Sequence, residues 1–322
     1  MSKEVKKKPG ASIGVDVDTL GSYYQAYGIA GKPAEDPVYS RGVPRYLELF
    51  RELEIRATFF LVARDLDHPA QLEIARRIRD EGHEIGSHSL THPFRFRSLP
   101  RPEKERQIRE AEEKMENLLG VRPRGFRVPG WDVDEETLSI LESRGYLYDS
   151  SVLPSLILPL LKLVHLLKGG AKRGTTGMGK NLCALAPSRP YFPSRKSIWR
   201  RGGHSLLEIP ISVTPLIRLP FFASWHLALN FFIYPWDYYL LRWLNVPINY
   251  ELHPIEMIDY SEGDYPPAIK AQPGFATPWR KKRQGIGDLL RRVKSDYRIV
   301  TFREQAELEI NGNRECADEM AL

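Results

Sequence analysis

The first 150 residues alternate short apolar segments with longer amphipathic ones, and this alternation is the strongest constraint on the fold. Strand-like apolar segments occur at residues 12–17, 57–62, 83–87, 125–127 and 145–148. Segments with apolar residues at helical spacing separate them, at residues 43–53, 69–81 and 102–119. Another helix is expected between an Asp132–Glu135 capping box and Gly145. Strands that alternate with helices of this length predict βαβ units around a parallel sheet.

Chemically versatile residues fall where the predicted strands end. They are Asp16, Asp18, His88, His92, Arg127 and Asp149. In a βα barrel the carboxyl ends of the strands converge on one mouth. We therefore expect an α/β chain folded as a distorted (β/α)7–8 barrel. No glycine-rich phosphate loop follows the first strand, which weakens the dinucleotide-binding alternative.

The regular pattern breaks after Ser150, and we expect one barrel over residues 12–308 with an apolar and aromatic insertion over about 152–246. Residues 248–253 and 297–302 resemble its last strands, with a helix at 286–293 between them. A flexible basic N-terminus (1–11) and a polar, frayed C-terminal tail (309–322) are expected outside the barrel.

The insertion contains an apolar segment (153–168), a basic glycine-rich loop (169–179) and an aromatic-rich segment (216–246). Prolines and charged residues interrupt both apolar segments, so neither has the roughly 18 apolar residues that a spanning helix needs. They are either core elements or an interfacial segment that touches a membrane.

Composition narrows the function only slightly. The chain has 47 Lys and Arg against 41 Asp and Glu, a formal charge of +6. An anionic membrane or a phosphate-bearing substrate fits this balance, while nucleic acid is not the partner that we expect. Cys183 and Cys316 lie far apart, which argues against a disulfide framework or a cysteine zinc site. Asp16 and Asp18 interrupt the apolar run after the basic start, so we expect no secretory signal. The expected location is the cytoplasm, either free or at the inner face of the cytoplasmic membrane.

Two motifs together predict a metal site. Asp16 and Asp18 are two residues apart on a strand, which places both carboxylates on one face. His88 and His92 have H-x-x-x-H spacing, but the flanking Gly86 and Pro93 favour a turn over a helix. Each motif alone is weak, since a lone aspartate is more often a cap. Combined, they give a His-His-Asp set with an open position, as in catalytic zinc sites.

The chain resembles the polysaccharide deacetylase family (family 4 carbohydrate esterases, the NodB-homology domain). Five motifs occur in the family's order: Asp16-Val17-Asp18, His88-Ser89-Leu90-Thr91-His92, Arg127-Val128-Pro129-Gly130-Trp131, Tyr148-Asp149-Ser150-Ser151 and Leu252-His253-Pro254. The resemblance implies a hydrolase acting on linear amides, a deacetylase or deformylase that needs a divalent metal, Zn²⁺ first and Co²⁺, Mn²⁺ or Ni²⁺ as alternatives.

The resemblance also implies a role for each residue. Asp18, His88 and His92 would hold the metal. Asp16 would be the general base, oriented and kept ionised by Arg127. His253 would be the general acid, its charge supported by Asp149. Pro129 and Trp131 would line the sugar site, although Trp131 could equally belong to the core. Val17 separates aspartates that are adjacent in the usual motif, so the roles of Asp16 and Asp18 could be exchanged.

Two branches of the family are most similar. Asp16-Val17-Asp18-Thr19 and Arg41-Gly42-Val43-Pro44-Arg45 resemble deformylases and deacetylases of lipid-linked amino sugars. Leu207-Glu208-Ile209-Pro210-Ile211-Ser212 and His253-Pro254-Ile255-Glu256 resemble exopolysaccharide deacetylases. We therefore expect the N-acyl amide of an amino sugar as substrate, either lipid-linked or part of a cell-envelope polysaccharide precursor. Peripheral contact with the membrane is also expected. The alternatives are a hydrolase of a small amide or nucleotide-linked amino sugar, and a non-catalytic carbohydrate- or membrane-binding barrel.

Overall fold

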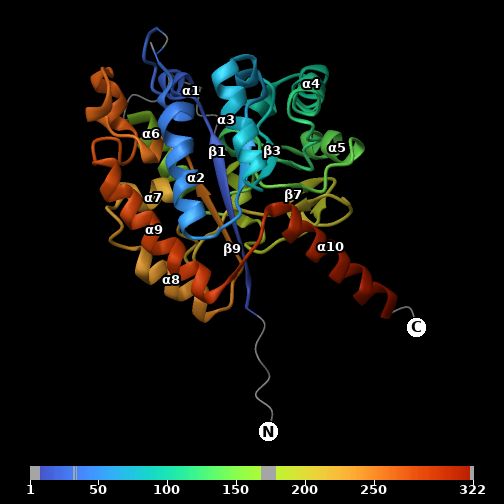
Figure 1. Ribbon diagram of the computed structural model, residues 1–322. Coiled ribbons are helices and arrows are strands. Elements are labelled where there is room, and N and C mark those ends of the chain that lie inside the picture. Colours follow the sequence, from blue (N-terminus) through green and yellow to red (C-terminus); the bar gives the residue numbers. More distant parts are fainter. Residues whose placement is uncertain (1–7, 32, 34, 168–178, 320–322) are drawn as a thin grey trace.

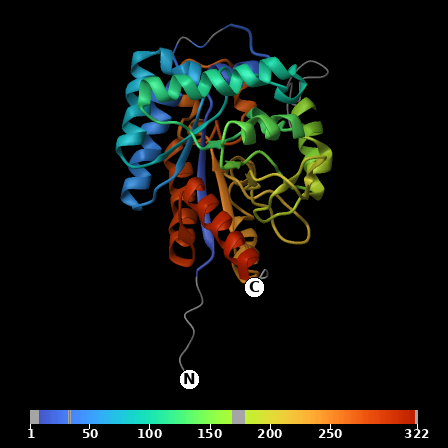
Figure 2. The same cartoon turned by 90° about the vertical axis from the view of Figure 1, so that its right-hand side faces the viewer.

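A curled sheet of parallel strands, covered by helices, forms the centre of the computed structural model (Figures 1 and 2), which describes residues 8–31, 33, 35–167 and 179–319. The sheet runs in the order β10-β1-β2-β3-β4-β5-β8. Along β1, β10 pairs with the first residues and β2 with the last ones, and β9 pairs with the opposite edge of the same strand. Its strands are β1 (Gly10–Val17), β2 (Thr58–Leu61), β3 (Glu84–Ser87), β4 (Gly125–Phe126), β5 (Tyr148–Asp149), β8 (Leu207–Glu208), β9 (Ile248–Leu252) and β10 (Arg298–Ile299).

The sheet curls so far that its two ends meet across a short gap. After β8 the chain reaches β9, where the backbone N–H of Ser212 donates to the carbonyl oxygen of Asn249 at 3.1 Å. The Asn249 side-chain amide spans the same gap by donating to the carbonyl oxygens of Ile209 and Pro210, each at 3.0 Å. The expected distorted βα barrel is confirmed.

Helices cover the outside of the barrel. They are α1 (Leu20–Ala26), α2 (Val43–Glu52), α3 (Pro69–Asp80), α4 (Arg101–Leu119), α5 (Glu135–Ser143), α6 (Leu158–Leu167), α7 (Ala223–Ala228), α8 (Tyr234–Trp243), α9 (Trp279–Asp296) and α10 (Phe302–Glu319). The alternation of β1 explains the layering. Ile13 and Val15 are buried in the main apolar cluster with Phe50 of α2 and Leu289 of α9, while Asp16 belongs to the opposite face.

Three local expectations were wrong. Asp134, and not Asp132, caps α5 by accepting the backbone N–H of Thr137 at 2.9 Å. Helix α9 is much longer than residues 286–293. The polar C-terminal segment continues α10 to Glu319, because buried Phe302 anchors its start against the barrel.

The segment over 152–246 is not one continuous insertion, because β8 within it is a strand of the barrel. Around β8 lie α6, the 3₁₀ helix Asn181–Leu185, the antiparallel hairpin of β6 (Pro193–Ser194) and β7 (Ser197–Arg201), and helices α7 and α8. Most of the basic loop at 169–179 lies outside the described residues. Within the described part of the chain, no helix has the length and apolarity needed to span a membrane.

Candidate active site

Asp18, His88 and His92 meet at the carboxyl ends of β1 and β3, as the sequence predicts. The Nε2 atoms of His88 and His92 lie 3.3 and 3.0 Å from Oδ1 of Asp18. One ligand atom from each residue lies within 4.8 Å of the others. Three ligand atoms at this spacing could bind one ion.

A tight turn, and not a helix, brings the two imidazoles together. Ser89 and His92 adopt left-handed backbone conformations, with φ of 70° and 55°. The Ser89 hydroxyl oxygen accepts the backbone N–H of His92 at 3.1 Å, and the two rings lie 5.0 Å apart at their centroids. Left-handed residues that are not glycine carry a conformational cost, so the packing around this turn must offset it.

The three residues fit a divalent cation. Nδ1 of His88 lies 2.7 Å from the carbonyl oxygen of Arg127, so this nitrogen carries the proton and Nε2 keeps its lone pair for a ligand. Oδ1 of Asp18 and Nε2 of His92 are buried without a hydrogen-bond partner. Burial opposes ionisation of Asp18, yet the two imidazoles hold its pKa well below the ordinary value. Nitrogen and oxygen ligands of this kind suit Zn²⁺ and neighbouring transition metals.

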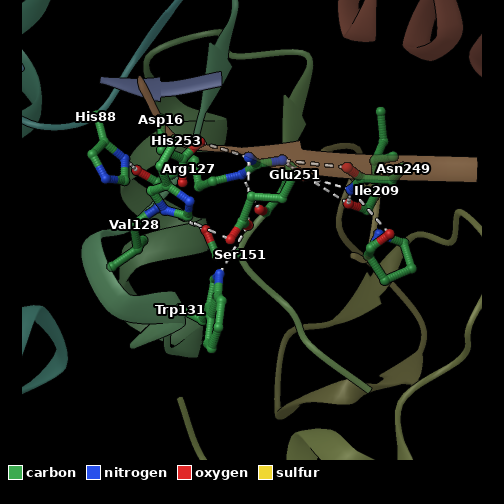
Figure 3. A network of polar contacts seen from close by, with 12 residues as sticks. Asp16, His88, Arg127, Val128, Trp131, Ser151, Ile209, Asn249, Glu251 and His253 are labelled. Atoms are coloured by element: carbon green, nitrogen blue, oxygen red, sulfur yellow. Dashed lines mark hydrogen bonds and ion pairs between the residues drawn. The ribbon is translucent and has the colours of Figure 1, made fainter. Parts of the chain in front are cut away.

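Arg127 connects this triad to a second polar group inside the barrel (Figure 3). Its Nη1 donates to Oδ1 of Asp16 at 2.6 Å, and its Nε donates to the Ser150 carbonyl oxygen at 2.8 Å. The guanidinium carbon lies 4.3 Å from the centroid of the Phe60 ring. A Cβ atom at Gly14 would lie 2.9 Å from Nη1, so the bare backbone of β1 leaves room for the fully buried guanidinium.

Glu251 is a member of this group that we did not predict. Its Oε2 lies 3.5 Å from Nη1 of Arg127 and accepts the indole N–H of Trp131 at 3.0 Å. The signal was in the sequence, since Asn249, Glu251 and His253 alternate with apolar residues along β9 and therefore point to one face. Asp16, Glu251 and His253 also bring their ligand-type atoms within 4.8 Å of one another.

Carboxylates surround His253. Its Nε2 lies 3.9 Å from Oε1 of Glu251, and its Nδ1 lies 3.6 Å from Oε1 of Glu256. Burial alone would lower the pKa of His253, but Glu256, Glu251 and Asp16 together raise it to about 10. The imidazole is therefore protonated at neutral pH and can donate a proton.

Asp149 lies in a different environment from the one that the resemblance implies. Its carboxylate accepts the Ser151 hydroxyl at 2.7 Å and pairs with Glu208, its neighbour across β5 and β8. Burial raises the pKa of both carboxyls, to about 6 for Asp149. Among the described contacts, the carboxylates near His253 are Glu251, Glu256 and Asp16, and not Asp149.

The two residues predicted to bind substrate differ in exposure. Pro129 is buried at the start of a short 3₁₀ turn. Trp131 is half-buried, and its ring centroid lies 5.5 Å from that of Phe222. Trp131 thus connects the mouth of the barrel to the apolar cluster that contains Phe222, as well as to Glu251.

Comparison with known proteins agrees with this geometry. The polysaccharide deacetylase family model matches residues 35–148, a range that includes both candidate histidine ligands and Arg127. The peptidoglycan deacetylase of Helicobacter pylori is 28% identical over 160 residues, which are 48% of this chain and 51% of that protein. The chitin deacetylase of Colletotrichum lindemuthianum is 28% identical over 106 residues, 32% of this chain and 42% of that protein. The chain thus spans about half or less of these relatives.

Structural comparison extends the likeness over almost the whole chain. A crystal structure from Mycobacterium smegmatis, described as that of a polysaccharide deacetylase, covers 98% of this chain, and 94% of its own chain is covered. Its TM-score is 0.61 at 18% identity, which shows a common fold. The family match thus identifies a polysaccharide deacetylase domain over residues 35–148, and the likeness in fold extends over almost the whole chain.

Proposed function

We propose that this chain is a divalent-metal-dependent hydrolase that removes an N-acetyl or N-formyl group from an amino sugar. The observation that carries the proposal is the pair of adjoining groups at one barrel mouth. Asp18, His88 and His92 present three ligand atoms, and Asp16 and His253 lie next to them for proton transfer. A non-catalytic barrel would have no need for both groups.

The metal would act as a Lewis acid. A divalent ion held by Asp18, His88 and His92, with Zn²⁺ as the first candidate, would polarise the amide carbonyl and lower the pKa of water. The chain's own contribution is the alignment of its ligands. The bond from His88 to the Arg127 backbone fixes one ring, and the Ser89–His92 turn fixes the other.

Asp16 and His253 would move the protons that amide hydrolysis requires. Asp16 would take a proton from the attacking water, since Arg127 holds one of its oxygens at 2.6 Å and leaves the other available. His253, protonated at neutral pH, would give a proton to the departing amine nitrogen. Separate base and acid groups allow both transfers without exchange with bulk water.

We assign the support of His253 to Glu251 and Glu256 in place of Asp149. Glu256 Oε2 also accepts the backbone N–H of His253 at 2.9 Å, so it fixes the position as well as the charge of the imidazole. Asp149 would instead maintain the barrel wall through Ser151, whose hydroxyl oxygen accepts the backbone N–H of Val128 at 2.8 Å.

The substrate class follows from the relatives and from Trp131. Peptidoglycan and chitin, the polymers in the relatives' names, are built from N-acylated amino sugars. The face of Trp131 would pack on the sugar ring beside the metal. We propose a cell-envelope amino sugar, carried on a polyprenyl lipid, as the form that reaches this site.

Mass spectrometry tests the proposal. The metal-loaded chain is incubated with N-acetyl and N-formyl amino sugars, both free and polyprenyl-phosphate-linked, and products are examined for loss of the acyl mass. His88→Ala and His92→Ala should give no product, whereas His68→Ala, at an exposed histidine outside the site, should match the wild type. Equal product from the His88 and His92 variants, or none from the wild type on any of these sugars, would refute it.

A further inference from the structure

Charge is distributed very unevenly along this chain. Of its 47 Lys and Arg and 41 Asp and Glu, residues 150–236 contain eleven basic residues and one acidic residue, Glu208. Glu208 is fully buried beside Asp149, so it contributes nothing to the surface. The net basic character of the protein therefore comes from this one segment, and the remainder has an excess of acidic residues. A basic segment of this kind is attracted to anionic surfaces.

Exposed apolar side chains are concentrated in the same part of the chain. Among the described residues, thirteen large hydrophobic side chains are exposed, and twelve of them lie between Leu156 and Leu244. Single exposed apolar residues are normal on a soluble protein, but exposed apolar side chains that lie together in space mark an interaction surface.

Seven of these side chains form a surface that we call the apolar rim. All are aliphatic: Leu156, Leu160, Leu163, Leu182, Leu185, Leu216 and Ile217. Leu160 is 55% exposed and Leu216 91% exposed. In α6 and the residues before it, Leu156, Leu160 and Leu163 have the spacing of one helical face.

Hydrogen bonds hold the three segments of the rim together. Nζ of Lys162 on α6 donates to Oδ1 of Asn181 at 2.7 Å, which places α6 beside the residue preceding Leu182. Nη1 of Arg218 donates to the carbonyl oxygens of Ala184 and Ala186 at 2.6 and 2.7 Å, on either side of Leu185. The Ser155 hydroxyl donates to the carbonyl oxygen of Arg218 at 2.8 Å.

The rim lies next to the candidate active site. Leu158 on the inner side of α6 packs in the cluster that also contacts Trp131, whose indole N–H reaches Glu251. The backbone N–H of Gly179 donates to the carbonyl oxygen of Gly130 at 3.1 Å, directly before Trp131. In Figure 1, α6 lies toward the end of the barrel where α1 follows β1, which is the end with the metal ligands.

Helix α8 bears a second exposed apolar face, at the opposite end. Phe232, Trp236 and Trp243 are exposed at helical spacing, but α8 lies toward the end of the barrel from which β1 starts (Figure 1). A flat surface placed against the mouth would contact the apolar rim and leave α8 free. The α8 face is therefore a matched control for the rim.

We propose that the apolar rim docks on an anionic lipid bilayer and turns the mouth of the barrel toward the membrane. This inference rests on the proposed function and extends it, since the amino sugar would be presented at the membrane surface. Aliphatic side chains would enter the interface, and the basic residues beside the rim, Lys162, Lys180 and Arg218, would lie near anionic head groups. These are the two contributions that peripheral binding requires.

Vesicle co-sedimentation with the full chain tests the proposal. The vesicles are phosphatidylcholine with about one-third phosphatidylglycerol, and phosphatidylcholine alone serves as the neutral comparison. The wild type should bind the anionic vesicles, and binding should weaken as salt rises. The triple variant Leu160→Ser, Leu163→Ser, Leu216→Ser should bind at least about tenfold less. The α8 triple variant Phe232→Ser, Trp236→Ser, Trp243→Ser removes more apolar area and should bind like the wild type.

Turnover of a free, water-soluble amino sugar separates the docking surface from the chemistry. The rim variant should hydrolyse that sugar as the wild type does. Loss of binding in the α8 variant and not in the rim variant would overturn the proposal, as would a wild type that stays in the supernatant while it hydrolyses the soluble sugar. A wild type that binds vesicles through the rim but hydrolyses neither sugar form would instead refute the proposed function alone.

Discussion

Arg127 and Asp16, which are 111 residues apart in the sequence, form a 2.6 Å ion pair inside the barrel. The Arg127 side chain is fully buried and that of Asp16 is 5% exposed, so water competes little with this contact. The same arginine binds His88 through its backbone carbonyl. One residue therefore orients both the candidate base and a candidate metal ligand.

Replacing Arg127 by Lys should lower turnover by about 10²-fold, because an ammonium cannot keep the contacts to Asp16 and Ser150 at once. Steady-state kinetics measure the loss, and circular dichroism confirms that the variant is folded. Arg124→Lys, at a half-buried arginine just before β4, is the control and should leave kcat unchanged. Equal kcat in the Arg127 variant and the wild type would show that Arg127 has no positioning role.

The two aspartates should separate in a metal-binding assay. Asp16→Asn should keep its metal and lose about 10²-fold or more of turnover, since it would lack a general base. Asp18→Asn should lose metal, because Oδ1 lies near both imidazoles and accepts no hydrogen bond. Elemental analysis after desalting gives the occupancy. The opposite pattern would mean that the roles are exchanged.

The protonation of His253 should make stability depend on pH in a defined window. In the metal-free chain its pKa is raised from the ordinary 6.5 to about 10. Its contribution to the free energy of unfolding is therefore complete below about pH 6.5 and is lost as the pH rises through about 10. Urea unfolding of the wild type and His253→Ala should show a stability difference that shrinks over this range. A constant difference would contradict the assigned charge.

Glu251→Gln should move the basic limb of the kcat profile to lower pH. The glutamine keeps an acceptor for the Trp131 indole but removes one of the negative charges that raise the pKa of His253. A structural role alone would lower kcat without moving the limb. Glu304→Gln, at a carboxylate of α10 paired with Arg56, is the charge-matched control and should not shift it.

Glu208→Gln should stabilise the protein at alkaline pH. Burial and the neighbouring Asp149 raise the pKa of Glu208 well above its ordinary value. An acid with a raised folded pKa destabilises the fold increasingly as the pH rises above its unfolded pKa of about 4.3. Urea unfolding should show a gain of about 1–2 kcal/mol at pH 8 and a smaller gain at pH 5. A loss of stability at pH 8 would show that the charged pair is favourable.

The sequence predicts the parts of this site that depend only on strand order. Parallel strands end on one mouth, so Asp18, His88 and Arg127 could be brought together without knowledge of the register. Glu251 alternates with Leu252, which gives the side of the strand on which it lies, but its contacts with Arg127 and Trp131 join segments about 120 residues apart and depend on tertiary packing. The contacts of Asp149 could not be predicted, because they depend on the register of β5 with β8, a two-residue strand in a segment without regular pattern.

The ends of two helices could not be predicted from the sequence either. The α10 segment is polar enough to suggest a frayed tail, and only the packing of Phe302 and Ala306 on the barrel shows why a helix begins there. Asp132 and Asp134 are both good caps by composition. The choice falls to Asp134 because Lys104 of α4 also binds its carboxylate, at 2.7 Å, a contact between segments 30 residues apart.

Metal titration of the apoprotein tests the central claim most directly. The chain is stripped with a chelator, Zn²⁺ is added in steps, and occupancy and hydrolysis of an N-acylated amino sugar are measured on the same samples. The account predicts one ion per chain and product formation that rises in proportion to occupancy, with no binding at this site in His88→Ala or His92→Ala. Full hydrolysis by the metal-free chain, or unchanged binding in both histidine variants, would contradict it.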